Sequence, residues 1–343
     1  MMVILGHLVG RAGAAVLALA LLVAALWLGA AIGETEIPFP VVAKTVANRL
    51  FGAGYPLEPL DEGIVWSYRL SRAVVAASCG SALALSGAVL QALLRNPLAD
   101  PYILGISAGA SAGAVSVAIL GVGGGLLALP VGAFIGALVA LAFVSLLALR
   151  AGRGTGTVIL AGVAGSQLFH ALTSFIITKA ASAEQTRGIM FWLLGNLSGV
   201  RWPDVHIAVP AVLSGLLVCL WHARALDAFT FGTASAASLG IPVRRTYVLL
   251  VATSAMMTAV MVSIVGSIGF VGLVIPHAAR MVVGLRHIVL LPVVALIGAV
   301  FMIIADIVSR TLIPGQVLPV GVITALVGAP AFALLLARGG SRS

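Results

Sequence analysis

Ten long apolar runs dominate this sequence, and little polar chain separates them. They lie at 12–32, 66–95, 101–120, 126–149, 156–179, 204–223, 246–268, 272–284, 287–311 and 317–337. A helix needs about 20 apolar residues to cross a bilayer, so every run except 272–284 is long enough to cross alone. Only 8% of the residues are charged, against about 25% in soluble proteins. The solvent of this chain is therefore lipid.

Backbone polar groups inside a bilayer must be hydrogen-bonded within the protein, which leaves helices or a closed barrel. Barrel strands alternate apolar and polar residues, whereas these runs are continuously apolar. The sequence therefore predicts an all-α polytopic membrane protein with about ten transmembrane helices.

No linker or low-complexity segment divides residues 1–343, so we expect a single transmembrane domain. Ten spans place both termini on the same side of the membrane. Cytoplasmic loops are enriched in basic residues, and the segments on the side of the termini hold most of the arginines, so we expect that side to be cytoplasmic. Arginines also occur at the opposite, outer side, at Arg69, Arg72, Arg187, Arg201 and Arg310.

The net charge of +9 raises the question of a nucleic-acid partner. The basic residues are scattered singly near the ends of the apolar runs, so we expect no nucleic acid and read them as membrane-end residues. Cys79 and Cys219 each lie inside an apolar run, which excludes a disulfide framework or a cysteine-based metal site. We predict no cofactor and no metal site.

The stretch "QALLRNPLADPYILGISAGASAGAVS", residues 91–116, interrupts the apolar pattern. Pro97 disfavours a helix at Asn96, while Asp100 and Pro101 favour a new helix start, so 96–100 is predicted to be a tight turn. Three glycines then recur at intervals of four: Gly105, Gly109 and Gly113. This spacing is typical of a helix face that a neighbouring helix approaches closely. The same residues match the serine-hydrolase elbow G-x-S-x-G around Ser107, but that elbow requires a β-sheet, which is not predicted here.

Several segments together identify a family. "GAVLQALLRNPLADPYILGISAGASAGA", "FWLLGNLSGVRW" (191–202), "GSIGFVGLVIPHAARMVVG" (266–284), "ADIVSR" and "LPVGVITALVGAPAF" resemble the signature of FecCD-type permeases. These are the membrane subunits of ABC importers for iron–siderophores, heme and vitamin B12. The resemblance covers most of residues 60–337. It implies the type II ABC importer architecture in the bacterial inner membrane.

The resemblance also implies partners. They are two separate ATP-binding subunits, an extracytoplasmic binding protein, and a second copy of the chain (a homodimer) or a homologous permease. The chain itself contains no phosphate-binding loop, because "GRGTGT" (152–157) lacks the lysine. A gradient-driven transporter is the rival hypothesis. It usually keeps ionisable residues at membrane depth, and the runs hold few beyond His170, His277 and Asp306, which can pair with Arg310 one helical turn away.

The polar segment 224–245 is predicted to form one or two short helices at the cytoplasmic surface. The resemblance assigns it to ATPase coupling, with contacts at Ala236, Ser238, Leu239 and Gly240; the alternative is a plain surface helix. The resemblance likewise implies that Arg69, Arg72 and Arg310 meet glutamates of the binding protein. The alternatives are snorkelling at the membrane surface or, for Arg310, pairing with Asp306.

The fifth run carries a stripe of polar residues at helical spacing: Ser166, Gln167, His170, Thr173, Ser174 and Thr178. In lipid such residues face other helices or a path, and the resemblance places this helix on the translocation path. A packing role, or a heme ligand at His170, remains the alternative. "ALTSFIITKA" and "FWLLGNLSG" look closer to siderophore-type members, so a ferric siderophore is the expected chelate, with heme and cobalamin as alternatives. An intramembrane serine hydrolase is a further rival.

Overall fold

The computed structural model describes residues 2–152, 155–179 and 182–339, and these residues fold almost entirely into helices. Each predicted run contains the main part of one α-helix, and the runs 66–95 and 101–120 also contain residues of a π-helix or a 3-10 turn before it. The ten are α1 (Met2–Ala31), α4 (Ser71–Leu94), α5 (Ile106–Ala118), α6 (Leu129–Ala151), α7 (Thr155–Ile177), α9 (Trp202–Trp221), α12 (Val243–Val265), α13 (Val271–Val283), α14 (His287–Thr311) and α15 (Val320–Gly339). Within the described residues, 6 helices are long and apolar enough to cross a membrane, and shorter apolar helices account for the other runs. The all-α membrane fold is confirmed, whereas the count of ten spans stays a prediction.

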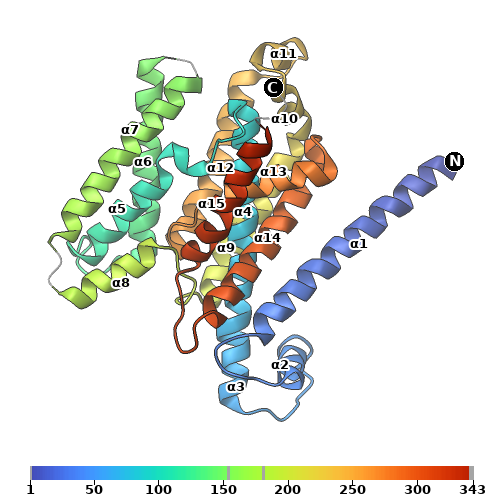
Figure 1. Ribbon diagram of the computed structural model, residues 1–343, viewed down its shortest axis with the longest axis vertical. Helices are drawn as coiled ribbons and strands as arrows, with labels where there is room; N and C mark the ends of the chain where they lie inside the picture. Colours follow the sequence, from blue (N-terminus) through green and yellow to red (C-terminus); the bar gives the residue numbers. More distant parts are fainter. Residues whose placement is uncertain (1, 153–154, 180–181, 340–343) are drawn as a thin grey trace.

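Short helices gather at the two ends of the bundle. At one end lie α2 (Phe39–Phe51), α3 (Pro59–Gly63) and the π-helix η1 (Ile64–Leu70), which runs directly into α4. At the other end lie α10 (Ala223–Thr230) and α11 (Thr233–Ser238), on the side toward which α1 begins and α15 ends (Figure 1). Following the predicted orientation, we call the α2–α3 end the outer end and the α10–α11 end the cytoplasmic end.

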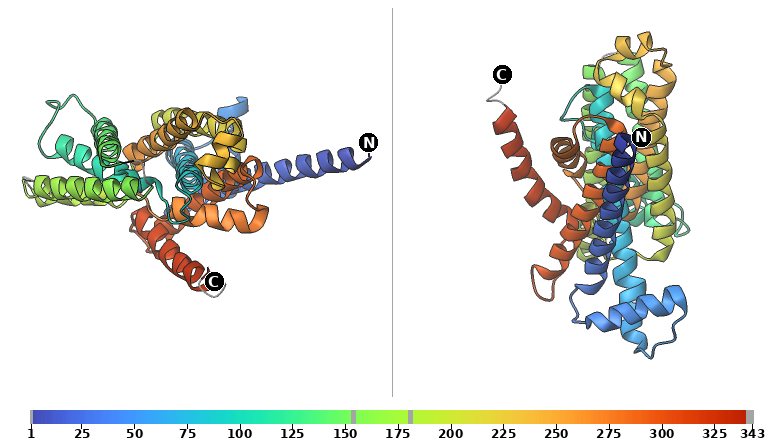
Figure 2. Two further views of the ribbon diagram at one scale, coloured as in Figure 1. Left: turned by 90° about the horizontal axis from the view of Figure 1, so that it is seen from above. Right: turned by 90° about the vertical axis from the view of Figure 1, so that its right-hand side faces the viewer.

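Helix α4 forms the centre of the bundle (Figure 2), and most of its side chains are buried. Its small residues explain why neighbouring helices come so close. A Cβ atom added at Gly80 would overlap the carbonyl oxygen of Gly298 on α14, and one added at Gly87 would overlap that of Gly272 on α13. Such close backbone contacts supply the packing that holds helices together in lipid, where no hydrophobic drive exists between them.

Helices α5, α6, α7 and α8 (Ala183–Leu193) form a second group beside this core, in contact with it through α12. Helices α1 and α15 lean away from the bundle. α1 contacts α14 and η1, and it diverges from them toward its start (Figures 1 and 2). Both helices carry exposed leucine and valine side chains, as expected for surfaces that meet lipid or another subunit.

The run predicted as one helix over 101–120 is interrupted. Pro101–Leu104 forms a 3-10 turn (η2), Gly105 takes a left-handed conformation with φ 75, and the α-helix begins only at Ile106. The predicted turn at 96–100 is present, and the Asp100 side chain accepts a hydrogen bond from the Tyr102 backbone at 2.9 Å. Only glycine adopts this φ without steric cost, so Gly105 allows the chain to change direction here.

Candidate functional site

The glycine-rich face of α5 packs directly on α6. A Cβ atom at Gly109 would overlap both the Gly136 carbonyl oxygen and the Ala140 side chain, and one at Gly113 would overlap the Gly132 carbonyl oxygen. The third glycine of the predicted series has a different role. At Gly105 a Cβ atom would lie 3.1 Å from a methyl group of Val144, and the positive φ is the stronger constraint.

Ser107 lies in the first turn of α5, where its hydroxyl oxygen is 2.7 Å from that of Ser267. A serine nucleophile needs a general base beside it and a strand-to-helix turn to expose it. Its partner is a second hydroxyl, and the residue sits inside a helix. The geometry therefore gives no support to the serine-hydrolase hypothesis.

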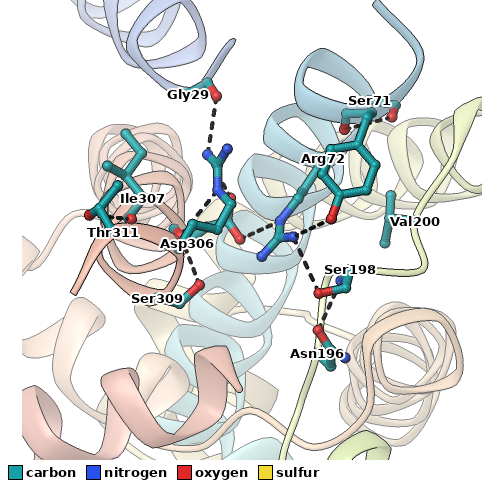
Figure 3. Close-up of polar contacts among 12 residues, drawn as sticks. Gly29, Ser71, Arg72, Asn196, Ser198, Val200, Asp306, Ile307, Ser309 and Thr311 are labelled. Carbon is teal, nitrogen blue, oxygen red and sulfur yellow. Dashed lines mark hydrogen bonds and ion pairs between the residues drawn. The ribbon is translucent and has the colours of Figure 1, made fainter. Parts of the chain in front are cut away.

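A buried ionic cluster lies near the outer end of the bundle (Figure 3). Arg72 on α4 donates from Nε to Asp306 Oδ1 at 2.7 Å, and Arg310 Nη2 lies 3.1 Å from the other carboxylate oxygen. Arg72 also donates to the hydroxyls of Ser198 at 3.3 Å and Tyr68 at 3.4 Å. The side chains of Arg72, Asp306 and Arg310 are 1–2% exposed. Both carboxylate oxygens and both guanidinium groups are therefore engaged within the chain.

Two arginines cap the end of α1. Arg310 donates to the carbonyl oxygens of Ile32 at 3.0 Å and Gly29 at 3.1 Å. Arg69 donates to Ala31 at 2.9 Å and also reaches the carbonyl of Thr35. The last carbonyls of a helix lack partners inside the helix, and cations there are also favoured by the helix dipole. The arginines thus fix the end of a helix that otherwise leans away from the bundle.

The structure corrects the interpretation of Arg69, Arg72 and Arg310 as a docking surface. Docking requires exposed guanidinium groups, and these three residues are 1–2% exposed. The alternative pairing of Arg310 with Asp306 is the arrangement observed. A small pocket of about 260 Å³ borders the cluster, and its lining residues are Glu34, Thr35, Ile64, Tyr68, Arg69 and Arg310.

Replacing Arg69 with alanine is expected to loosen the end of α1 without unfolding the bundle. The carbonyls of Ala31 and Thr35 lose their donor, so amides in 29–35 should exchange with solvent several-fold faster in hydrogen–deuterium exchange of the nanodisc-embedded protein. Arg201→Ala is the matched control, because this exposed outer arginine donates to Ser198 and Val200 and not to α1. Equal exchange in both variants would contradict the capping role.

The polar stripe of α7 is narrower than predicted. Gln167, His170, Ser174 and Thr178 are exposed along one face of the helix. Thr173 is buried and donates to the Phe169 carbonyl at 2.8 Å, so its proposed place on the path wall is wrong in this structure. Ser166 is half-buried at the edge of the face. No group of three or more His, Cys, Asp or Glu side chains that could hold a metal ion occurs among the described residues. His170 as a heme ligand stays a hypothesis.

The segment predicted to couple to an ATPase forms α10 and α11, as two short helices at the cytoplasmic end. Leu226 and Phe229 anchor α10 in the core. Ser238, Leu239 and Gly240 are exposed, with Leu239 71% exposed, whereas Ala236 is fully buried and offers no surface to a partner. Sequence reasoning missed Phe231, which is 79% exposed in the turn between the two helices. Its position as an aromatic residue in the polar segment 224–245 could have marked it as a contact residue.

Comparison with known proteins matches residues 21–338 to the FecCD transport family. The chain is 44% identical to the cobalamin import system permease protein BtuC of Halobacterium salinarum, covering 88% of this chain and 79% of that protein. It is 40% identical to the vitamin B12 import system permease protein BtuC of Escherichia coli O6:H1, covering 82% and 86%. It is also 39% identical to the ABC transporter permease protein YvrB of Bacillus subtilis, covering 96% and 94%.

Solved structures show the same likeness. A metal-chelate type ABC transporter in an inward-facing conformation superposes with a TM-score of 0.80 and 30% identity, covering 94% of this chain and 97% of that chain. PsaBC from Streptococcus pneumoniae in complex with Fab, with a TM-score of 0.57 and 20% identity, shares the fold over 85% of this chain and 94% of its own. The family match spans nearly the whole chain and agrees with the helical order and with the resemblance of the motifs. The chain therefore belongs to the FecCD transport family and is a permease of an ABC importer, a multi-pass protein of the cytoplasmic membrane.

Proposed function

We propose that this chain is the membrane-spanning subunit of an importer for cobalamin or a closely similar corrinoid. The observation that carries the proposal is the identity of 44% over 88% of the chain to a protein named as a cobalamin import permease. The sequence patterns alone favoured a ferric siderophore, because the segments "ALTSFIITKA" and "FWLLGNLSG" look closer to siderophore-type members. Similarity spread over most of the chain outweighs that local resemblance.

Two separate ATP-binding subunits supply the energy in this proposal, and an extracytoplasmic binding protein delivers the chelate. The sequence has no phosphate-binding loop. The α10–α11 segment presents Phe231, Ser238 and Leu239 at the cytoplasmic end. Exposed apolar side chains on a polar surface segment favour contact with a partner protein.

A second copy of the chain, or a homologous permease, completes the path. The exposed face of α7 bears polar groups from Gln167 to Thr178, with no Asp, Glu, Lys or Arg between them. Large apolar side chains flank it, including Leu172 and Phe175, at 43% and 62% exposure. A wall without acidic, lysine or arginine side chains suits a bulky chelate whose charges are already compensated.

A ferric siderophore is the second candidate substrate, and heme the third. The structural similarity to a metal-chelate type transporter, at 30% identity, favours the chelate class without choosing a member of it. The exposed side chains of α7 do not by themselves select among these molecules.

The substrate is tested by ATP hydrolysis in the complete transporter, reconstituted in nanodiscs with its ATPase and each candidate binding protein. We expect cyanocobalamin-loaded binding protein to stimulate hydrolysis several-fold over the unloaded protein. A ferric hydroxamate siderophore or hemin should not stimulate it. Stimulation by the siderophore and none by cyanocobalamin would overturn the corrinoid assignment and leave the importer class intact.

A further inference from the structure

The cytoplasmic end of α14 is capped by a residue from a different helix. The residue before α14, Arg286, makes no side-chain cap, and the first turn of α14 contains no acidic residue. Asp227 on α10 takes this place. Its Oδ1 accepts a hydrogen bond from the His287 backbone N–H at 2.9 Å. The first amides of a helix need such an acceptor, and a negative charge there is favoured by the helix dipole.

The same carboxylate also holds the His287 side chain. Asp227 Oδ1 lies 2.7 Å from His287 Nδ1, so the imidazole donates to it from that nitrogen. The imidazole is almost fully buried, and its other nitrogen, Nε2, has no hydrogen-bond partner among the described residues. Asp227 is therefore the one described group that fixes this side chain by hydrogen bonding, and it does so across 60 residues of sequence.

Asp227 lies on the element proposed to meet the ATPase. Leu226 and Phe229, on either side of it in sequence, are buried in the core. The turn that follows α10 places Gly232 against Arg95, at the end of α4. A movement of α10 would therefore displace groups at two places, the end of α4 and the start of α14. The carboxylate of Asp227 makes the polar contact with α14.

Helix α14 leads from this cap to the buried ionic cluster. Asp306 lies about 28 Å further along the helix axis, at ~1.5 Å per residue. There it binds Arg72 of α4 and Arg310, which holds the carbonyls at the end of α1. One helix therefore has its cytoplasmic end fixed by the coupling segment and its outer end fixed to α4 and α1.

We propose that Asp227 is a positioning residue that links the coupling segment to α14, so that displacement of α10 during the ATPase cycle moves α14. This inference rests on the proposed function, because an ATPase must act on α10 and α11. The Asp227–His287 contact then acts on the yield of transport per ATP hydrolysed, and not on hydrolysis itself.

The test compares Asp227→Ala and Asp227→Asn in the complete transporter, in proteoliposomes. Two quantities are measured: cyanocobalamin accumulated per ATP hydrolysed, and hydrogen–deuterium exchange at 287–290 in the permease alone. Alanine should lower the transport yield at least five-fold, with ATP hydrolysis within two-fold of wild type, and should speed exchange at the start of α14. Asparagine keeps an acceptor for the His287 amide without the charge, so both effects should be smaller. This variant also serves if the alanine variant folds poorly.

Asp204→Ala is the matched control. Asp204 caps the outer end of α9 by accepting from the Arg201 backbone N–H at 2.8 Å, far from the coupling segment. It should speed exchange at the start of α9 and leave the transport yield unchanged. A normal yield in Asp227→Ala despite faster exchange at 287–290 would reduce Asp227 to a structural cap and overturn the inference. A wild-type transporter without ATP-driven uptake would instead contradict the proposed function before any variant is compared.

Discussion

Replacing Asp306 with alanine is expected to destabilise the protein severely. The substitution leaves the guanidinium groups of Arg72 and Arg310 buried with no carboxylate, where each is at most 2% exposed. Removing one partner of a buried ion pair typically costs about 3–5 kcal/mol, and here two cations lose the same partner. We expect little folded protein after extraction, and a clearly lower thermal unfolding midpoint for the fraction that folds.

Asp306→Asn is the control for this prediction. The amide keeps the size of the side chain and one oxygen acceptor but removes the charge, so its stability should lie between wild type and the alanine variant. A wild-type unfolding midpoint for Asp306→Ala would show that water reaches both arginines, and the buried cluster would then be the wrong description of this end of the bundle.

Leucine at Gly109 is expected to prevent α5 and α6 from packing. The added side chain must enter space occupied by the Gly136 carbonyl and the Ala140 side chain. Overpacking usually costs about 1–3 kcal/mol, when neighbouring side chains can shift. Here the obstacle includes backbone, so the cost should reach or exceed the upper end of that range. Size-exclusion chromatography after mild detergent extraction should show aggregate in place of a monodisperse peak.

Two controls separate packing from other causes. Gly188→Leu introduces the same side chain on α8, where an added Cβ meets nothing within 4 Å, and should fold normally. Ser107→Ala removes one hydroxyl contact with Ser267, worth about 1 kcal/mol, and should leave uptake near wild type. A monodisperse, active Gly109→Leu protein would show that the α5–α6 contact is looser than described.

The positions of the membrane helices could be predicted from the sequence because apolar length alone determines them. The break at Gly105 could not, because G-x-x-x-G spacing is equally compatible with an uninterrupted helix. The interrupted segment is held by contacts that form only in the fold. Among them, the Tyr102 hydroxyl donates to the Ile268 carbonyl at 3.0 Å, across 166 residues.

The path-lining stripe illustrates a limit of helical periodicity. Successive residues are about 100° apart around a helix, so the six predicted residues of α7 span about 140°. Thr173 and Ser166 lie at one edge of that arc. Helix α7 packs on α5 and α6, and the structure buries Thr173. The sequence shows which residues share this arc of α7, but only the packing of α7 on other helices determines which of them are buried.

The arginines illustrate a different limit. The charge bias of loops tells which end of a helix a residue occupies, but not whether its side chain turns inward. The pairing of Asp306 with Arg310 could be predicted because both lie on one helix. The partner of Arg72 is 234 residues away. The acceptors of Arg69 are backbone carbonyls at and just beyond the end of α1, which no side-chain pattern reveals.

The most direct test of this account is uptake of radiolabelled cyanocobalamin into proteoliposomes that hold the permease, its ATPase and the loaded binding protein. We expect accumulation only when ATP is present on the ATPase side, and no ATP hydrolysis by the permease alone. Dissipating the proton and sodium gradients with ionophores should leave the rate unchanged. Uptake that persists without the ATPase and stops when a gradient is dissipated would contradict the account and favour a secondary transporter.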